Sequence, residues 1–148
     1  MTGRPDIYAI DFGTSNSLLA AANRDAVLAP IPLDPAHHDP SVLRSILYFS
    51  EDARWSFGQE ALAAYVEAGM RGRLMRSLKR FLPAKDFEET RIGTRRVRLP
   101  ELVGVFLRTL RERANRHFGA DVRRVLLGRP ARFSGHLDPD QHRAGRLR

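Results

Sequence analysis

Two apolar runs around a short polar turn constrain the fold of this chain more than any other feature. The runs cover residues 7–12 and 18–22, and the turn between them reads Gly-Thr-Ser-Asn-Ser over residues 13–17. Apolar runs of this length joined by turn-forming residues predict a β-hairpin. We therefore expect any chemistry of this segment to lie at the tip of the hairpin.

The residues at the tip are suited to binding a phosphate group. Asp11 closes the first strand, and Gly13 carries no side chain that would keep a ligand away from the backbone. Thr14, Ser15 and Asn16 offer successive backbone N–H groups, and a concave run of such donors binds anions. The carboxylate of Asp11 would repel a bare phosphate, so a cation such as Mg²⁺ is expected between the two. The stretch thus predicts a nucleotide-phosphate loop.

The same turn is open to other interpretations. An ordinary hairpin turn stays open, because Asp, Gly, Ser and Asn are favoured in turns of every kind. Residues 11–13 also spell the metal-binding tripeptide of protein kinases, but the remaining kinase motifs cannot precede residue 11. Neither the Walker pattern nor the dinucleotide fingerprint occurs in the chain, so a nucleotide site here belongs to another class.

Composition favours one folded domain without disulfides or membrane spans. The 148 residues are 43% hydrophobic and contain no cysteine, which excludes a disulfide scaffold and a cysteine-based metal site. No apolar run is long enough to cross a bilayer, and the start of the chain lacks a signal-like apolar core. We expect a cytoplasmic protein with no membrane partner.

The chain is strongly basic, and its basic residues are almost all arginine. The formal net charge is +8, and only Lys79 and Lys85 among the 25 basic residues are lysines. The arginines are spread along the chain with few aromatic residues among them, which favours a solvated basic surface over a nucleic-acid site. The scarcity of lysine draws attention to each one that is present.

Periodicity and turn signals predict a mixed α/β chain. Pro30 and Pro32 place a predicted third strand at a sheet edge. His37, His38 and Asp39 are interpreted as a polar turn and not as a metal site, because neighbours on an extended chain point to opposite sides. The predicted elements are strands at 26–33, 45–49 and 55–57, a helix at 58–68, a ribbon at 90–99, a helix at 100–118, a buried strand at 125–127 and a helix that begins at Asp138.

The helix at 100–118 carries the clearest signal. Pro100 and Glu101 suit its first turn, and Gly119 suits its end. Its apolar residues share one face, which predicts that this face packs against the core: Leu102, Val103, Phe106, Leu107, Leu110, Ala114 and Phe118.

Several segments in this order resemble the seventy-kilodalton heat-shock chaperones, the DnaK-like branch of the actin-like ATPases. Asp-Phe-Gly-Thr-Ser-Asn-Ser at 11–17 is similar to the first phosphate loop of the family, Asp-Leu-Gly-Thr-Thr-Asn-Ser. Leu-Lys-Arg-Phe-Leu at 78–82 is similar to the Ala-Lys-Arg-Leu-Ile segment that carries the family's catalytic lysine, and residues 45–49, 57–61 and 100–119 also correspond. Val-Leu-Leu-Gly-Arg-Pro-Ala-Arg-Phe at 125–133 is similar to Val-x-Val-Pro-Ala-Tyr-Phe, so the resemblance covers about residues 7–136.

The resemblance implies ATP and Mg²⁺ as ligands. Asp11 would hold Mg²⁺ through its waters, and Gly13, Thr14, Ser15 and Asn16 would bind the phosphates. Lys79 would lie at the γ-phosphate and act with Asp11 in catalysis. Pro130 would fall on the proline that links ATP hydrolysis to peptide binding. Ala9, Ser15 and Pro83 differ from the usual family residues and indicate a divergent branch, and Arg143 cannot be matched.

The resemblance also implies a part of a larger domain. The family's second phosphate loop, Asp-x-Gly-Gly-Gly-Thr, is not found in the 148 residues. We expect residues 5–148 to be an incomplete N-terminal lobe of an actin-like (ribonuclease H-like) ATPase, with a smaller α/β subdomain inserted at about 38–99. The whole protein would be an ATP-dependent chaperone that binds unfolded polypeptides and co-chaperones, while the fragment alone would show little hydrolysis. The alternatives are an actin-like carbohydrate kinase or exopolyphosphatase-type hydrolase, or a basic nucleic-acid-binding module.

Overall fold

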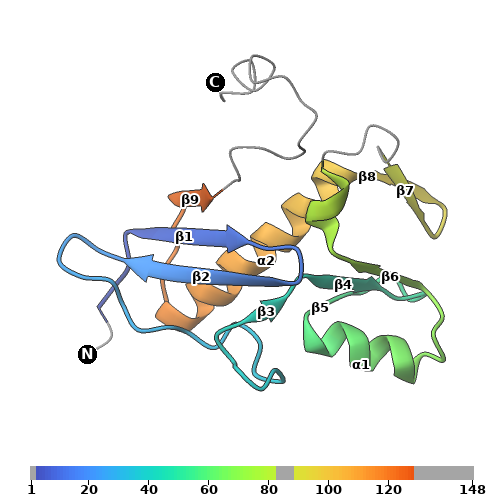
Figure 1. The fold of residues 1–148 in the computed structure, drawn as a ribbon, viewed down its shortest axis with the longest axis horizontal. Coiled ribbons are helices and arrows are strands. Elements are labelled where there is room, and N and C mark those ends of the chain that lie inside the picture. Colours follow the sequence, from blue (N-terminus) through green and yellow to red (C-terminus); the bar gives the residue numbers. More distant parts are fainter. Residues whose placement is uncertain (1–2, 83–88, 129–148) are drawn as a thin grey trace, which may run out of the picture.

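A computed structural model describes residues 3–82 and 89–128, which form a mixed α/β arrangement (Figure 1). The described part contains three sheets, two α-helices and one short 3₁₀ helix. The strands are β1 (Ile7–Phe12), β2 (Asn16–Ala22), β3 (Leu43–Arg44), β4 (Ile46–Phe49), β5 (Trp55–Phe57), β6 (Arg73–Arg76), β7 (Glu89–Ile92), β8 (Arg95–Arg98) and β9 (Val125–Gly128). The helices are α1 (Gln59–Glu67), η1 (Leu78–Phe81) and α2 (Leu99–Phe118).

The predicted hairpin is the centre of a four-stranded sheet. β1 and β2 pair antiparallel with Phe12 opposite Ser17, so the turn between them is short. The strand order is β3-β2-β1-β9, and β9 runs parallel to β1 after the chain has crossed over through α2. Because side chains alternate along a strand, Tyr8, Ile10 and Phe12 are buried while Ala9 and Asp11 are exposed. The sheet therefore has one covered face and one open face.

The segment between β3 and α2 builds a second layer beyond the tip of the hairpin (Figure 1). β4 is the middle strand of an antiparallel sheet in the order β5-β4-β6, and β7 and β8 form a separate two-stranded ribbon. The predicted elements at 55–57, 58–68 and 90–99 are confirmed as β5, α1 and the ribbon. All of them fall within the predicted insertion at 38–99, whose boundaries stay a prediction.

Helix α2 covers the inner face of the four-stranded sheet. The carboxylate of Glu101 accepts a hydrogen bond from the backbone N–H of Arg98 at 3.3 Å, and Gly119 ends the helix with a φ of 59°. The predicted apolar face is confirmed, since its central residues are fully buried and the others partly so: Leu102, Phe106, Leu110 and Ala114, then Val103, Leu107 and Phe118.

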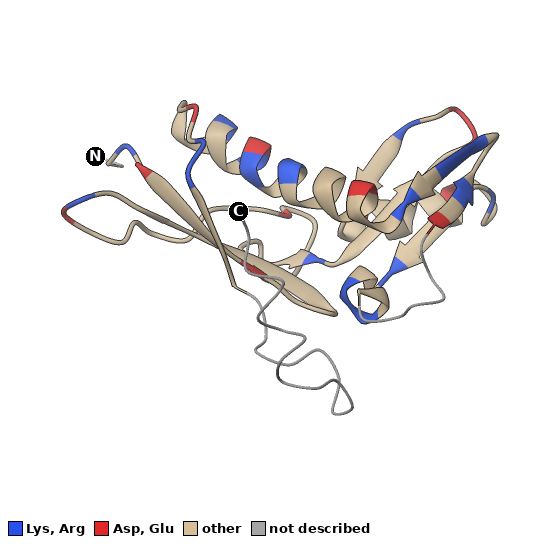
Figure 2. Cartoon of the chain, turned by 90° about the horizontal axis from the view of Figure 1, so that it is seen from above, with Lys and Arg blue, Asp and Glu red and all other residues tan. Residues whose placement is uncertain are grey.

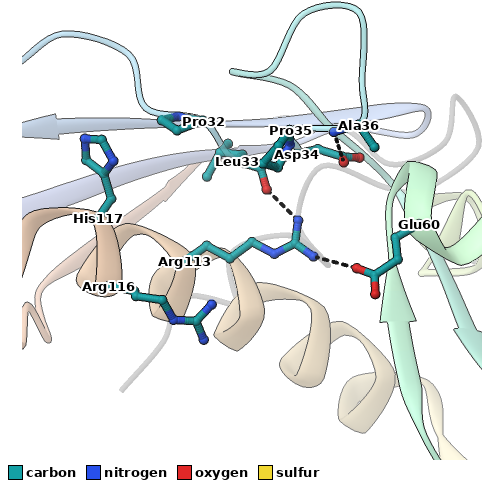
Figure 3. Close-up of a pocket in the computed structure, with 9 residues that line it drawn as sticks. All are labelled: Pro32, Leu33, Asp34, Pro35, Ala36, Glu60, Arg113, Arg116 and His117. Atoms are coloured by element: carbon teal, nitrogen blue, oxygen red, sulfur yellow. Dashed lines mark hydrogen bonds and ion pairs between the residues drawn. The ribbon is translucent and has the colours of Figure 1, made fainter.

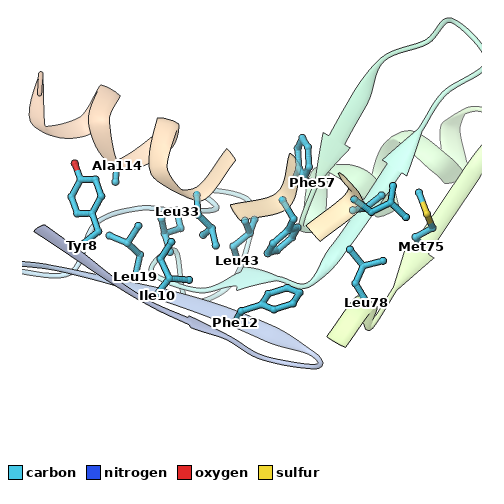
Figure 4. Packing of buried hydrophobic residues seen from close by; sticks show 14 of the residues in the cluster. Tyr8, Ile10, Phe12, Leu19, Leu33, Leu43, Phe57, Met75, Leu78 and Ala114 are labelled. Atoms are coloured by element: carbon cyan, nitrogen blue, oxygen red, sulfur yellow. The ribbon is translucent and has the colours of Figure 1, made fainter. Parts of the chain in front are cut away.

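One continuous core joins the two layers (Figure 4). Tyr8, at the start of β1, lies at one end of this core. Met75 and Leu78 of the second layer lie at the other end, near Phe12 at the tip of the hairpin. Phe106 of α2 contacts both sides, because its ring centroid lies 5.6 Å from that of Phe12 and 6.2 Å from that of Phe57. The hairpin and the second layer are thus packed as one body, which fixes the hairpin tip relative to η1.

Two predictions about strands are wrong. The segment 26–33 is not a strand of the sheet, because only an isolated bridge between Ala22 and Val27 forms there. Pro30 and Pro32 lack the N–H that a ladder needs, and the short β3 pairs with the start of β2 instead. The strand at 125–127 does form, as β9, but its side chains are exposed and not buried.

The predicted helix from Asp138, together with Pro83, Pro130 and Arg143, lies outside the described residues. No helix in the described ranges is long and apolar enough to span a membrane.

Candidate functional site

The turn at the tip of the hairpin is folded too tightly for a side chain at Gly13. A Cβ atom placed there would lie 2.0 Å from the backbone oxygen of Asn16, far inside van der Waals contact. A glycine is therefore required at position 13 because a side chain would clash with Asn16, whereas the expectation from the sequence was that it leaves room for a ligand. The next three residues of this tight turn, 14–16, are exposed.

The turn offers donors that no other described residue uses. Thr14 and Ser15 are exposed, and in the described part of the chain neither their backbone N–H groups nor their hydroxyls donate a hydrogen bond. Asn16 is exposed as well and begins β2. Exposed, unpaired and adjacent donors of this kind fit an anion such as phosphate.

Asp11 lies next to these donors on the open face of the sheet. Its cross-strand neighbours are Leu18 on β2 and Gly128 on β9, and its carboxylate forms no ion pair or hydrogen bond with any described residue. No group of three or more His, Asp or Glu side chains in the described ranges could hold a metal ion. A lone carboxylate can still hold a cation that keeps most of its waters, as Mg²⁺ commonly does.

Ser45 is the residue that fixes the shape of the turn. Its hydroxyl donates to the backbone oxygen of Gly13 at 2.8 Å and lies 2.9 Å from the hydroxyl of Ser17. Its backbone N–H donates to the oxygen of Ser15, also at 2.8 Å. The Ser45 hydroxyl has one proton, which it gives to Gly13, so Ser17 must be the donor in the second bond. Both serines are buried, so the bond between their hydroxyls is shielded from water, and the bond to Gly13 is partly buried.

Ser45 also connects the turn to the segment that contains Lys79. The backbone oxygen of Ser45 accepts a hydrogen bond from the N–H of Ser77 at 3.1 Å. Ser77 has a left-handed backbone with φ 57° and ψ 44°, which is costly for a residue with a side chain and is frequent at functional sites. The buried side chain of Leu78 then anchors η1 in the core, and Lys79 follows.

Lys79 is half-buried, and its ammonium group has no hydrogen-bond or ion-pair partner in the described ranges. The structure thus places Asp11, Gly13, Thr14, Ser15 and Asn16 together at the hairpin tip. It links them to Lys79 only through Ser45 and Ser77, because no direct bond joins the lysine to the turn.

Sequence reasoning missed the role of Ser45, which it treated only as the start of a strand. One signal was available, since residues 45–49 are among the segments that resemble the chaperone family. A contact between residues 28 or more positions apart leaves no trace in local periodicity, however.

A separate concavity of about 500 Å³ lies between α2, the loop at 32–36 and α1 (Figure 3). Arg113 crosses it: one guanidinium nitrogen donates to the backbone oxygen of Leu33, and another lies 3.9 Å from a carboxylate oxygen of Glu60. The buried carboxylate of Asp34 accepts from the N–H of Gln59 at 2.7 Å and so supports the first turn of α1. None of the predicted site residues lines this concavity, whose polar groups mainly hold three elements together.

The turn at 37–41 is held by local bonds. The Asp39 carboxylate accepts hydrogen bonds from the hydroxyl of Ser41 at 2.7 Å and from its N–H at 3.0 Å. These bonds lower the pKa of the Asp39 carboxyl group. The ring of His37 is bonded to the backbone of Asp39, which makes this segment a polar turn.

Basic residues are distributed along α2 and over the second layer (Figure 2). Six of the described arginines lie within 4.0 Å of a carboxylate, five of them with exposed side chains. Exposed pairs of this kind contribute little to stability but reduce the local positive charge.

No protein-family model matches the chain, and no curated protein matches it significantly.

Proposed function

We propose that this chain forms part of the nucleotide-binding domain of a DnaK-like, ATP-dependent chaperone, within an actin-like (ribonuclease H-like) lobe. The sheet order β3-β2-β1-β9, in which a parallel strand follows an antiparallel hairpin through α2, is compatible with such a lobe. The whole protein would act in the cytoplasm and couple ATP hydrolysis to the binding of unfolded polypeptides.

The residues of the hairpin tip would bind the phosphates of ATP. Thr14, Ser15 and Asn16 would donate to phosphate oxygens, and Asp11 would hold Mg²⁺ through its waters. Bound Mg²⁺ would neutralise phosphate charge during phosphoryl transfer. The ammonium group of Lys79 would add a second positive charge near the γ-phosphate. In an actin-like site the nucleotide lies between two lobes, so these residues would form one wall of it.

The observation that carries this proposal is the position of Ser45 between the two predicted halves of the wall. One buried serine bonds to Gly13, Ser15 and Ser17 on one side and to Ser77 on the other. The same serine therefore joins the backbone of the turn to the segment that precedes Lys79. The open donors of Thr14 and Ser15 favour phosphate over the ordinary-turn interpretation.

Titration of the ¹⁵N-labelled chain with Mg-ATP tests the proposal. We expect weak binding, with amide shifts concentrated at residues 13–17 and 77–81, and no shifts with adenosine alone. Lys79→Ala should weaken binding roughly tenfold, the loss of about one charge-assisted interaction. Arg80→Ala is the matched control, because Arg80 is the adjacent exposed cation.

Three results would overturn the proposal. Submicromolar affinity for Mg-ATP would contradict a site with only one wall. Shifts spread along the arginines of α2, with equal losses in Lys79→Ala and Arg80→Ala, would indicate unspecific attraction of polyphosphate. Stimulation of ATP turnover by a sugar in the whole protein would favour the carbohydrate kinase alternative.

A further inference from the structure

Arg44 lies beside the hairpin tip although it belongs to a distant segment of the chain. It is the second residue of β3, and its partner across the β2–β3 pairing is Asn16. Residues that face each other in an antiparallel pair project from the same side of the sheet, with Cβ atoms about 4.5–5.5 Å apart. The neighbouring pair of Ser17 and Leu43 is buried, so Arg44 and Asn16 project from the opposite, outer face.

The same outer face carries Asp11. Asp11 lies opposite Leu18, and Leu18 and Asn16 share one side of β2. A carboxylate on β1, an amide on β2 and a guanidinium group on β3 therefore follow one another across this face, next to the free donors of the turn. The strand spacing and the two-residue offset place the backbones of Asp11 and Arg44 roughly 12 Å apart, which leaves room for a phosphate group between their side chains.

The guanidinium group of Arg44 has no partner within the described ranges. Arg44 is half-buried, and neither a hydrogen bond nor an ion pair engages its side chain there. A guanidinium group is always charged and offers five N–H donors in a planar fork that matches a phosphate. Partial burial removes some of its water without supplying an acceptor, so an anion would gain from pairing with it.

The backbone of Arg44 is held in place relative to the turn. The next residue, Ser45, donates its N–H to the oxygen of Ser15 and its hydroxyl to the oxygen of Gly13, both at 2.8 Å. The strand pairing with Asn16 fixes the other side. A cation positioned in this way loses little further freedom when it binds a ligand.

We propose that Arg44 binds a phosphate group of the nucleotide from the β3 side of the hairpin tip. This inference rests on the proposed function and adds to it a residue that determines which ligands the site accepts. Arg44 would also offset the carboxylate of Asp11, which by itself repels a phosphate. The site should therefore keep part of its affinity for a polyphosphate when Mg²⁺ is absent.

The test uses the ¹⁵N-labelled chain and two probes, Mg-ATP and inorganic triphosphate without a metal ion. We expect both probes to shift the side-chain Nε–H signal of Arg44 together with the amides of residues 13–17. Arg44→Ala should weaken the binding of both probes roughly tenfold, the loss of about one charge-assisted interaction. Arg44→Lys should recover only part of this loss, because lysine keeps the charge but lacks the planar fork.

Arg24→Ala is the matched control. Arg24 is exposed and follows β2 at the end of the hairpin that lies away from the turn at 13–17, so the variant removes an equal charge from a distant position. Because salt screens exposed charges at this range, the affinity for either probe should fall by less than about twofold.

The outcomes separate this inference from the proposed function. An Arg44 signal that stays fixed while Mg-ATP shifts the amides of 13–17 would overturn the role of Arg44 alone. Equal losses in Arg44→Ala and Arg24→Ala would also overturn it, since they would show attraction by overall charge. Triphosphate binding that depends on Arg44, without any shift by Mg-ATP, would uphold Arg44 and refute the nucleotide proposal. No shift with either probe would overturn both.

Discussion

The two faces of the four-stranded sheet differ sharply although the same strands form both. On the inner face, Tyr8, Ile10 and Phe12 pack under α2 and are at most 4% exposed. On the outer face, Ala9, Asp11 and Leu18 are exposed to solvent. Because side chains alternate along a strand, stability and candidate chemistry occupy successive residues of β1. Substitutions at neighbouring residues of β1 should therefore change either the stability of the fold or the candidate chemistry, but not both.

The largest effect is expected from Phe12→Ala. This substitution removes a buried ring that contacts Phe106 and should lower the free energy of unfolding by about 3–5 kcal/mol, through lost burial and a cavity. Urea denaturation measures the change. Asp11→Asn, the next residue on the outer face, is the control and should change stability by less than about 0.5 kcal/mol. Similar losses in both variants would refute the division between the faces.

A smaller loss is expected from Ser45→Ala. The variant leaves the partly buried oxygen of Gly13 and the buried hydroxyl of Ser17 without their partner, which should cost about 1–3 kcal/mol. Hydrogen exchange should accelerate at residues 13–17 in particular. Ser41→Ala removes a hydroxyl bond in an exposed turn and serves as the control. Unchanged exchange at the hairpin tip would show that Ser45 does not hold the turn.

Tyr8 should make stability depend on pH at the alkaline end. Burial raises the pKa of its hydroxyl group, which donates to Asn115 at 2.9 Å. The neutral form is favoured in the folded state, so its contribution is complete below the ordinary tyrosine pKa and is lost as pH rises through the folded value. Tyr8→Phe should cost about 0.5–1.5 kcal/mol near neutral pH, for one hydrogen bond.

The difference in the free energy of unfolding between wild type and Tyr8→Phe should become smaller above a pH of about 10, the unperturbed tyrosine pKa. Thermal denaturation of both proteins across this range measures it. If the difference in stability between the two proteins did not change with pH, burial of the Tyr8 hydroxyl group on the inner face would be contradicted.

The smallest effect is expected from Leu18→Thr on the outer face. The Leu18 side chain is 44% exposed, and threonine suits a strand, so stability should change by less than about 0.5 kcal/mol. A loss comparable to that of Phe12→Ala would mean that the outer face is covered in solution, and sedimentation would then reveal the association.

Local patterns in the sequence predicted the elements whose signals are local. Two short apolar runs around a polar turn predicted β1 and β2, and the 3.6-residue period with its terminal signals predicted α2. The predicted strand at 26–33 does not form, because its apolar content favours a strand but Pro30 and Pro32 lack the N–H groups that a hydrogen-bonded ladder needs. β3 has two residues and leaves no periodic signal at all.

The candidate site was predictable only in part for the same physical reason. Asp11 and the donors at 13–16 adjoin in sequence, so their proximity follows from the hairpin. The link from Gly13 through Ser45 to Ser77 joins three distant segments, and only packing of the second layer against the sheet brings them together. Whether Lys79 serves ATP stays a prediction.

Crowding around Gly13 limits which residues this segment can accept at position 13. A side chain there collides with Asn16, so every replacement should reduce the amount of folded protein in a cell, whatever the ligand. Thr14 and Ser15 meet no such barrier, and replacements there should leave abundance intact while lowering growth only where the activity is needed. A deep mutational scan with both readouts would thus separate architecture from chemistry within three adjacent codons.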